Sequence, residues 1–71
     1  MRFGNLEAEF TRIGLSVEKV SQELGFNKLV IYNRMKGKTN WTLTDMLKIQ
    51  KFVNEKTKTH HTLDYLFAKE V

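Results

Sequence analysis

Apolar residues recur along this chain at intervals of three and four, which is the spacing of amphipathic helices. Leu6, Phe10 and Ile13 form the first such stripe, and similar stripes follow toward the end of the chain. No run of alternating apolar and polar residues is long enough to indicate a strand. The pattern therefore predicts an all-α protein, a compact bundle of about five short helices.

Polar residues and a glycine indicate where the first helix begins and ends. Asn5 is expected to be its N-cap, and Gly14 is expected to stop it. Glu7 and Glu9 would then lie near the positive end of the helix dipole, which favours acidic side chains at that position.

Two further short helices are predicted within residues 16–36. Ser16 is placed to cap the earlier helix, and Gly25 supplies the positive φ with which the backbone leaves it. Asn27 is expected to cap the later helix, which runs to about Met35. The residues expected on the inner side of the earlier helix are Val17, Val20, Ser21 and Leu24.

An advance of about 100° per residue divides the later helix into two faces. The residues expected to face the core are Asn27, Val30, Ile31 and Arg34. The residues expected to face solvent are Leu29, Tyr32, Asn33 and Lys36, with Lys28 at the margin. Because Arg34 has a long aliphatic stem, we expect its charged end to turn outward and Met35 to fill the space.

A fourth helix is predicted after Trp41, which we expect to form a lid on the core. Thr42 and Asp45 stand at the spacing of a capping box. The buried side of this helix is expected to comprise Leu43, Met46, Leu47, Ile49, Phe52 and Val53. Residues 54–61 are interpreted as a polar loop. Thr62 then caps a last short turn whose apolar residues are Leu63, Leu66 and Phe67.

The composition is that of one small domain, residues 1–71, with a modest positive charge. Lys and Arg number 12 against 8 Asp and Glu, a formal net charge of +4 that favours a polyanionic partner. The chain has no cysteine, which excludes disulfides and thiolate metal sites and is consistent with a reducing cytoplasm. No apolar run is long enough for a membrane span, so we expect a cytoplasmic protein with no membrane partner.

Candidate catalytic and metal-binding groups are few. His60 and His61 are adjacent, and neither a cysteine nor an acidic cluster accompanies them, so solvated loop residues are the favoured interpretation. The sequence has no recognisable pair of nucleophile and base, and no glycine-rich loop of the phosphate-binding kind. We therefore expect no enzyme, no small-molecule substrate, no cofactor and no metal site.

The segment VSQELGFN, residues 20–27, carries the strongest functional signal. A small residue, a Leu-Gly pair, an apolar residue and a polar cap follow one another in this order. This arrangement resembles the helix-turn-helix of phage repressors and Cro-type regulators, which are lambda-repressor-like proteins. The resemblance extends over nearly the whole chain, through residues 41–43 to residues 62–67. It implies a regulator that acts in the cytoplasm of a bacterial host, within the genetic switch of a temperate phage.

The resemblance also implies roles for single residues. The positions that match base-reading residues of the family are Lys28, Leu29 and Asn33, with Tyr32 between them. The positions that match phosphate contacts are Lys36, Lys38 and the following loop residues Thr39 and Asn40. Asn33 has the groups to read adenine, Lys28 those to donate to guanine, and Leu29 can pack on a thymine methyl group.

Two functions remain open at this point, with different partners. In the first, the protein binds double-stranded operator DNA through the helix that follows Asn27. In the second, the protein is an antirepressor, a modulator of repression that binds a phage repressor through the same face, because Leu29 and Tyr32 also suit a protein interface. An antitoxin-like role and a homodimer are further open alternatives.

Overall fold

Five helices form the framework of the computed structural model, which describes residues 3–69. In chain order they are α1 (Gly4–Arg12), α2 (Val17–Leu24), α3 (Lys28–Met35), α4 (Leu43–Thr57) and α5 (Leu63–Leu66). The described residues contain no strand, so the predicted all-helical class is confirmed. Within the same residues, no helix has the length and apolar character needed to cross a membrane.

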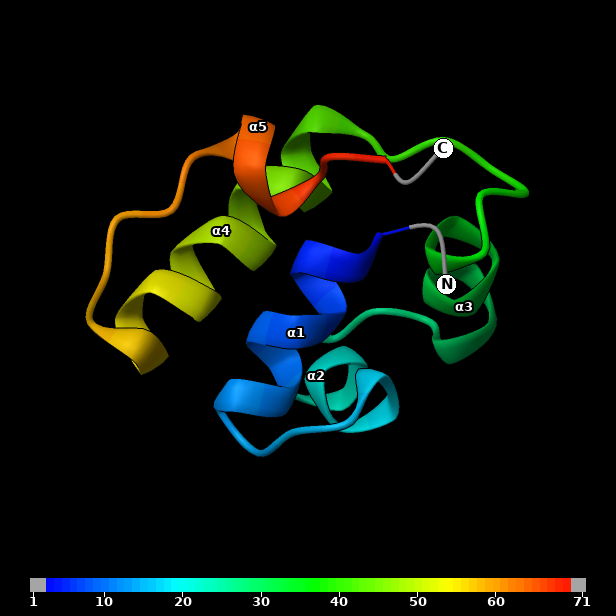
Figure 1. The fold of residues 1–71 in the computed structure, drawn as a ribbon. Helices are drawn as coiled ribbons and strands as arrows, with labels where there is room; N and C mark the ends of the chain where they lie inside the picture. The colour runs from blue at the N-terminus through cyan, green and yellow to red at the C-terminus, as the bar shows by residue number, and fades with distance from the viewer. Residues whose placement is uncertain (1–2, 70–71) are drawn as a thin grey trace.

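α1 occupies the middle of the molecule (Figure 1). It contacts α2, α4 and α5, whereas α2 packs most closely against α3. The apolar faces of the helices therefore meet around α1. The buried apolar residues are Phe3, Leu6, Phe10, Val20, Ile31, Met35, Ile49, Val53 and Leu66.

The predicted caps of the four later helices are confirmed. The side-chain oxygen of Ser16 accepts a hydrogen bond from the Lys19 N–H at 3.1 Å. Thr42 and Thr62 cap α4 and α5 in the same way, with N–H to oxygen distances of 3.3 Å and 3.1 Å. These caps satisfy backbone N–H groups that have no partner within their own helix.

α1 begins earlier than the sequence indicated. Its N-cap is Phe3, and Asn5 lies inside the helix, so the prediction that Asn5 caps it is wrong. The Asn5 side chain instead donates a hydrogen bond to the backbone oxygen of Tyr65 at 2.9 Å. Asn5 thus ties α1 to α5, a role that only the fold reveals because the partner is 60 positions away.

The prediction for Trp41 is confirmed, because its ring covers one edge of the core. It makes edge-to-face contacts with Phe3 and Phe67, with ring centroids 5.9 Å and 5.0 Å apart. The ring is partly buried and connects the residue before α1 to the residue after α5.

α4 begins as predicted but differs from its prediction at its C-terminal end and on its buried side. The helix runs to Thr57, so the polar loop does not start at Asn54 as expected. Asn54 instead holds the backbone of His61: its Oδ1 accepts from the His61 N–H at 2.9 Å, and its Nδ2 donates to the carbonyl at 3.2 Å. Leu43 and Leu47 are 60% and 47% exposed, not buried, because the core meets the side of α4 that carries Ile49 and Val53.

A buried polar cluster fastens α5 and the preceding loop to α1. The fully buried carboxylate of Glu9 accepts a hydrogen bond from the Tyr65 hydroxyl at 3.0 Å and lies 3.0 Å from His61 Nε2. The rings of His61 and Tyr65 stack on each other, and Arg12 Nε lies 3.5 Å from the same carboxylate. We call these four residues the Glu9 cluster.

The Glu9 cluster corrects two predictions. Glu9 does not lie in the first turn of α1, where the helix dipole would favour it, but is buried further along the helix. His61 is not simply a solvated loop residue, although His60 is exposed. Burying a carboxylate is costly unless hydrogen bonds and charges compensate it, and these partners supply that compensation. The hydrogen bond to Glu9 also raises the pKa of Tyr65 above its ordinary value, with help from burial.

Candidate functional site

The position of α3 is set by a short turn after α2. Gly25 has a φ of +72°, in the left-handed region that glycine adopts without strain. The small Ser21 is buried beside the turn, with its hydroxyl donating to the Val17 carbonyl at 2.8 Å, so the helices can approach closely. Phe26 packs against the core from the turn itself. Local backbone geometry and packing therefore hold α3 across α2.

Ile31 and Met35 fasten α3 to the core. They are 2% and 0% exposed and lie one turn apart on the same side of the helix. Val30 is 41% exposed and Asn27 is exposed, so the prediction that these two residues face the core is wrong. Met35 is buried, as expected, and the buried side of α3 is centred between Ile31 and Met35.

Arg34 joins the last turn of α3 to the first turn of α4. Its guanidinium forms an ion pair with the Asp45 carboxylate, and the two side chains are 14% and 23% exposed. The guanidinium also lies 5.8 Å from the centre of the Trp41 ring. The expectation that Arg34 turns outward to solvent is therefore wrong. The hydrogen bond from Arg34 is the main reason why the pKa of Asp45 is lowered from 3.8.

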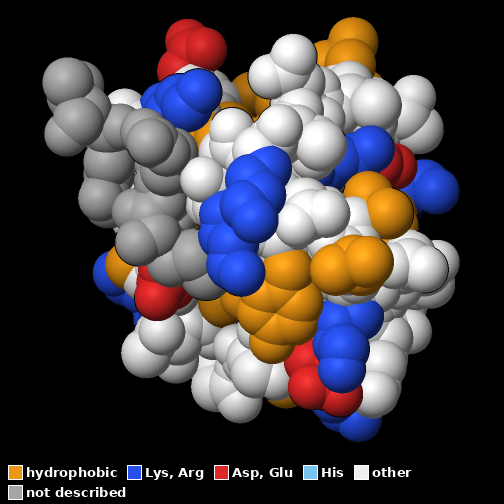
Figure 2. All heavy atoms as spheres, turned by 90° about the vertical axis from the view of Figure 1, so that its right-hand side faces the viewer, with side chains coloured by type: hydrophobic (Ala, Val, Ile, Leu, Met, Phe, Trp, Pro, Cys, Tyr) orange, Lys and Arg blue, Asp and Glu red, His pale blue; other side chains and the backbone are white. Residues whose placement is uncertain are grey.

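The opposite side of α3 faces solvent, and it carries the residues that the sequence singled out. Leu29 is 68% exposed, and Lys36 is also exposed. Asn33 and Tyr32 are half-buried on the same half of the helix. Lys28 stands at its edge, where its ammonium lies 3.7 Å from the Glu18 carboxylate. Figure 2 shows this side of the molecule, with Lys and Arg side chains interspersed among apolar ones.

The loop after α3 extends this surface. Gly37 has a φ of +80° and turns the chain away from the helix. The following residues Lys38, Thr39 and Asn40 are all exposed. The Lys38 N–H donates to the Asn33 carbonyl at 2.9 Å, which anchors the loop to the end of α3. We call the outward side of α3 together with residues 36–40 the α3 surface.

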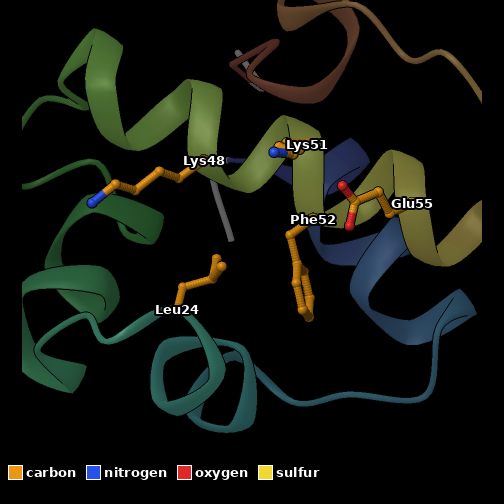
Figure 3. A pocket seen from close by; sticks show the side chains of 5 residues that line it. All are labelled: Leu24, Lys48, Lys51, Phe52 and Glu55. Carbon is orange, nitrogen blue, oxygen red and sulfur yellow. The ribbon is translucent and has the colours of Figure 1, made fainter.

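A shallow pocket lies elsewhere, between the end of α2 and the middle of α4 (Figure 3). Leu24 and Phe52 form its apolar walls, and its other lining residues are Lys48, Lys51 and Glu55. Its volume of about 200 Å³ is below the roughly 300–1,000 Å³ that is usual for small-molecule sites. The α3 surface is thus the stronger candidate for a functional site.

Val30 is the exposed residue of this site that the sequence interpretation placed wrongly. The signal that would have placed it is the spacing of four between Ile31 and Met35, which defines one buried stripe and leaves Val30 to one side. Glu18 was also missed as the partner of Lys28, because it belongs to the preceding helix.

Within residues 3–69, no group of three or more His, Cys, Asp or Glu side chains is arranged to hold a metal ion. Comparison with protein-family models, with curated proteins and with solved structures gave no match for this chain.

Proposed function

We propose that α2 and α3 form a helix-turn-helix of the phage repressor and Cro type, and that the protein is a transcriptional regulator that binds operator DNA. The observation that carries the proposal is the outward side of α3, which stands free of the core beside an exposed basic loop. A helix of eight residues held in this way has the size and exposure needed to enter the major groove.

The chemistry of the α3 surface suits this role. The Asn33 amide has both a donor and an acceptor, as adenine requires, while Lys36 and Lys38 supply charge for phosphate groups. The Lys28 ammonium forms an ion pair with the Glu18 carboxylate. An exposed ion pair of this kind contributes only about 0–1 kcal/mol to stability, so a DNA phosphate or base can compete with Glu18 for the ammonium.

Substitutions on the α3 surface are expected to separate base reading from phosphate binding. Asn33→Ala should lower the preference for the operator over a scrambled duplex roughly ten-fold, the equivalent of one good base contact. Lys36→Ala should weaken binding to both duplexes and reduce the salt slope by about 0.9, the value for one phosphate contact. Fluorescence anisotropy at about 0.15 M salt, using duplexes from the DNA upstream of the coding sequence, measures both effects.

Lys51→Ala is the matched control, because Lys51 is an exposed lysine on α4, away from α3. Lys51→Ala should leave the affinity for both duplexes and the salt slope close to their wild-type values. Equal binding of the two duplexes by the wild-type protein would contradict the proposal. Equal loss of affinity in the Lys36→Ala and Lys51→Ala variants would show that general charge, and not the α3 surface, holds the DNA.

A second candidate function is supported by the apolar character of the first turn of α3. Leu29 and Val30 are both exposed, and together with Tyr32 they suit contact with another protein. In this alternative the protein is an antirepressor that covers the DNA-binding face of a repressor. Leu29→Ala and Tyr32→Ala should then weaken a complex with the repressor, measured by calorimetry, more than Asn33→Ala and Lys36→Ala do.

A further inference from the structure

Two apolar side chains stand next to each other at the start of the α3 surface. Leu29 and Val30 are 68% and 41% exposed, and both lie in the first turn of α3. The Asn27 side chain holds the backbone of both, accepting from the Leu29 N–H at 2.9 Å and the Val30 N–H at 3.2 Å. This capped turn is rigid, and β-branched Val30 has few rotamers in a helix. The backbone of the pair, and with it the direction in which each side chain leaves the helix, is therefore set before any partner binds.

We propose that Leu29 and Val30 read the C5-methyl groups of pyrimidines in the operator, which are thymine methyl groups in unmodified DNA. This inference rests on the proposed function. The first turn of a recognition helix contacts base edges, and the thymine methyl is the apolar group of the major groove. Leu29 and Val30 carry no hydrogen-bonding side-chain atoms, so facing an adenine, guanine or cytosine edge they would remove water from polar groups without replacing the hydrogen bonds.

The geometry of the helix indicates that two bases are read. Successive side chains on an α-helix are separated by about 100°, so Leu29 and Val30 diverge and do not contact the same methyl group. Lys28 and Asn33 stand on either side of the pair in the sequence and offer hydrogen bonds where the pair offers none. The expected half-site therefore holds two pyrimidine methyl groups, next to positions that are read by hydrogen bonds.

The test begins by selecting tight-binding duplexes with the wild-type protein from a randomised pool. Each conserved thymine of the selected duplex is then replaced by deoxyuridine, which removes only the methyl group. Removal of a contacted methyl should weaken wild-type binding about four-fold, as for one buried methylene group. We call this loss of affinity the deoxyuridine penalty. The Leu29→Ala variant should lose the penalty at the thymine that Leu29 contacts, and the Val30→Ala variant should lose it at the thymine that Val30 contacts. These exposed helical positions accept alanine without disturbing the fold.

Leu47→Ala is the matched control, because it removes an equally apolar, half-exposed side chain on α4. It should leave the deoxyuridine penalty intact. A further duplex carries 5-methylcytosine in place of a contacted thymine, and partial recovery relative to unmethylated cytosine would support recognition of the methyl group itself.

The possible outcomes separate this inference from the proposed function. Sequence-specific binding that tolerates deoxyuridine at every thymine would overturn the proposal that Leu29 and Val30 contact methyl groups. It would leave the DNA-binding proposal in place. The proposal would also be overturned if the Leu29→Ala and Val30→Ala variants lost as much affinity as the wild-type protein when deoxyuridine replaces thymine. If no sequence is enriched from the pool, both proposals fail, and the antirepressor function is the candidate that is left.

Discussion

Replacement of Glu9 by alanine is expected to lower the free energy of unfolding by about 2–4 kcal/mol, a large fraction of the stability of a small domain. The Glu9 carboxylate is fully buried and is the common partner of the Tyr65 hydroxyl and His61 Nε2. Its removal leaves both groups without that partner and opens a cavity between α1 and α5. Urea unfolding followed by circular dichroism measures the loss.

Glu7→Ala is the matched control on the same helix, because the side chain of Glu7 is only partly buried. It is expected to change the free energy of unfolding by less than about 0.5 kcal/mol, the usual range for a surface substitution. Similar losses in the two variants would mean that the Glu9 cluster contributes nothing beyond general charge. Hydrogen exchange should also show that α5 becomes less protected in the Glu9→Ala variant only.

The ion pair between Arg34 and Asp45 is expected to make the second large contribution to the free energy of unfolding. Arg34→Met should destabilise the fold by about 1–3 kcal/mol, because it leaves a partly buried carboxylate without its partner. Asp45→Asn should act similarly, and the double variant should lose less than the sum of the two. Additive losses would show that the two side chains do not stabilise each other.

The same pair predicts how stability depends on pH. The folded-state pKa of Asp45 is lowered from 3.8, chiefly by the hydrogen bond from Arg34. The stabilisation is therefore fully present above the unfolded value near 3.8 and is lost as the pH falls through the lower folded value. Acid titration of the Arg34→Met variant should show a smaller decrease over this range than the wild-type protein. An unchanged titration curve would contradict the assignment.

Local features of the fold could be predicted from the sequence with good accuracy. Four caps, the turn at Gly25 and the lid formed by Trp41 were expected and are present. Each depends on residues that are neighbours in the chain, or on an aromatic residue next to a capped helix. The outward placement of Leu29 and Lys36 was also predictable, because the helical period alone determines it.

The errors arose where distant residues decide the outcome. Glu9 is buried because its partners are 52 and 56 positions away, and nothing near it in the sequence marks that burial. Leu43 and Leu47 form an apolar stripe at helical spacing, yet the core meets α4 on a neighbouring side. Val30 was misplaced because the stripe that shows which side of α3 is buried consists of one pair only, Ile31 and Met35, and Val30 is the apolar neighbour of that pair in the sequence.

The way α3 is fastened has a consequence for how this protein can diverge. Ile31 and Met35 hold the helix to the core, and Arg34 holds it to α4 from the side. The residues that define the outward side of α3 take no part in this fastening. Substitutions at its exposed positions can therefore accumulate without a matching loss of stability, so the chemistry of this side of α3 can change while the fold stays the same.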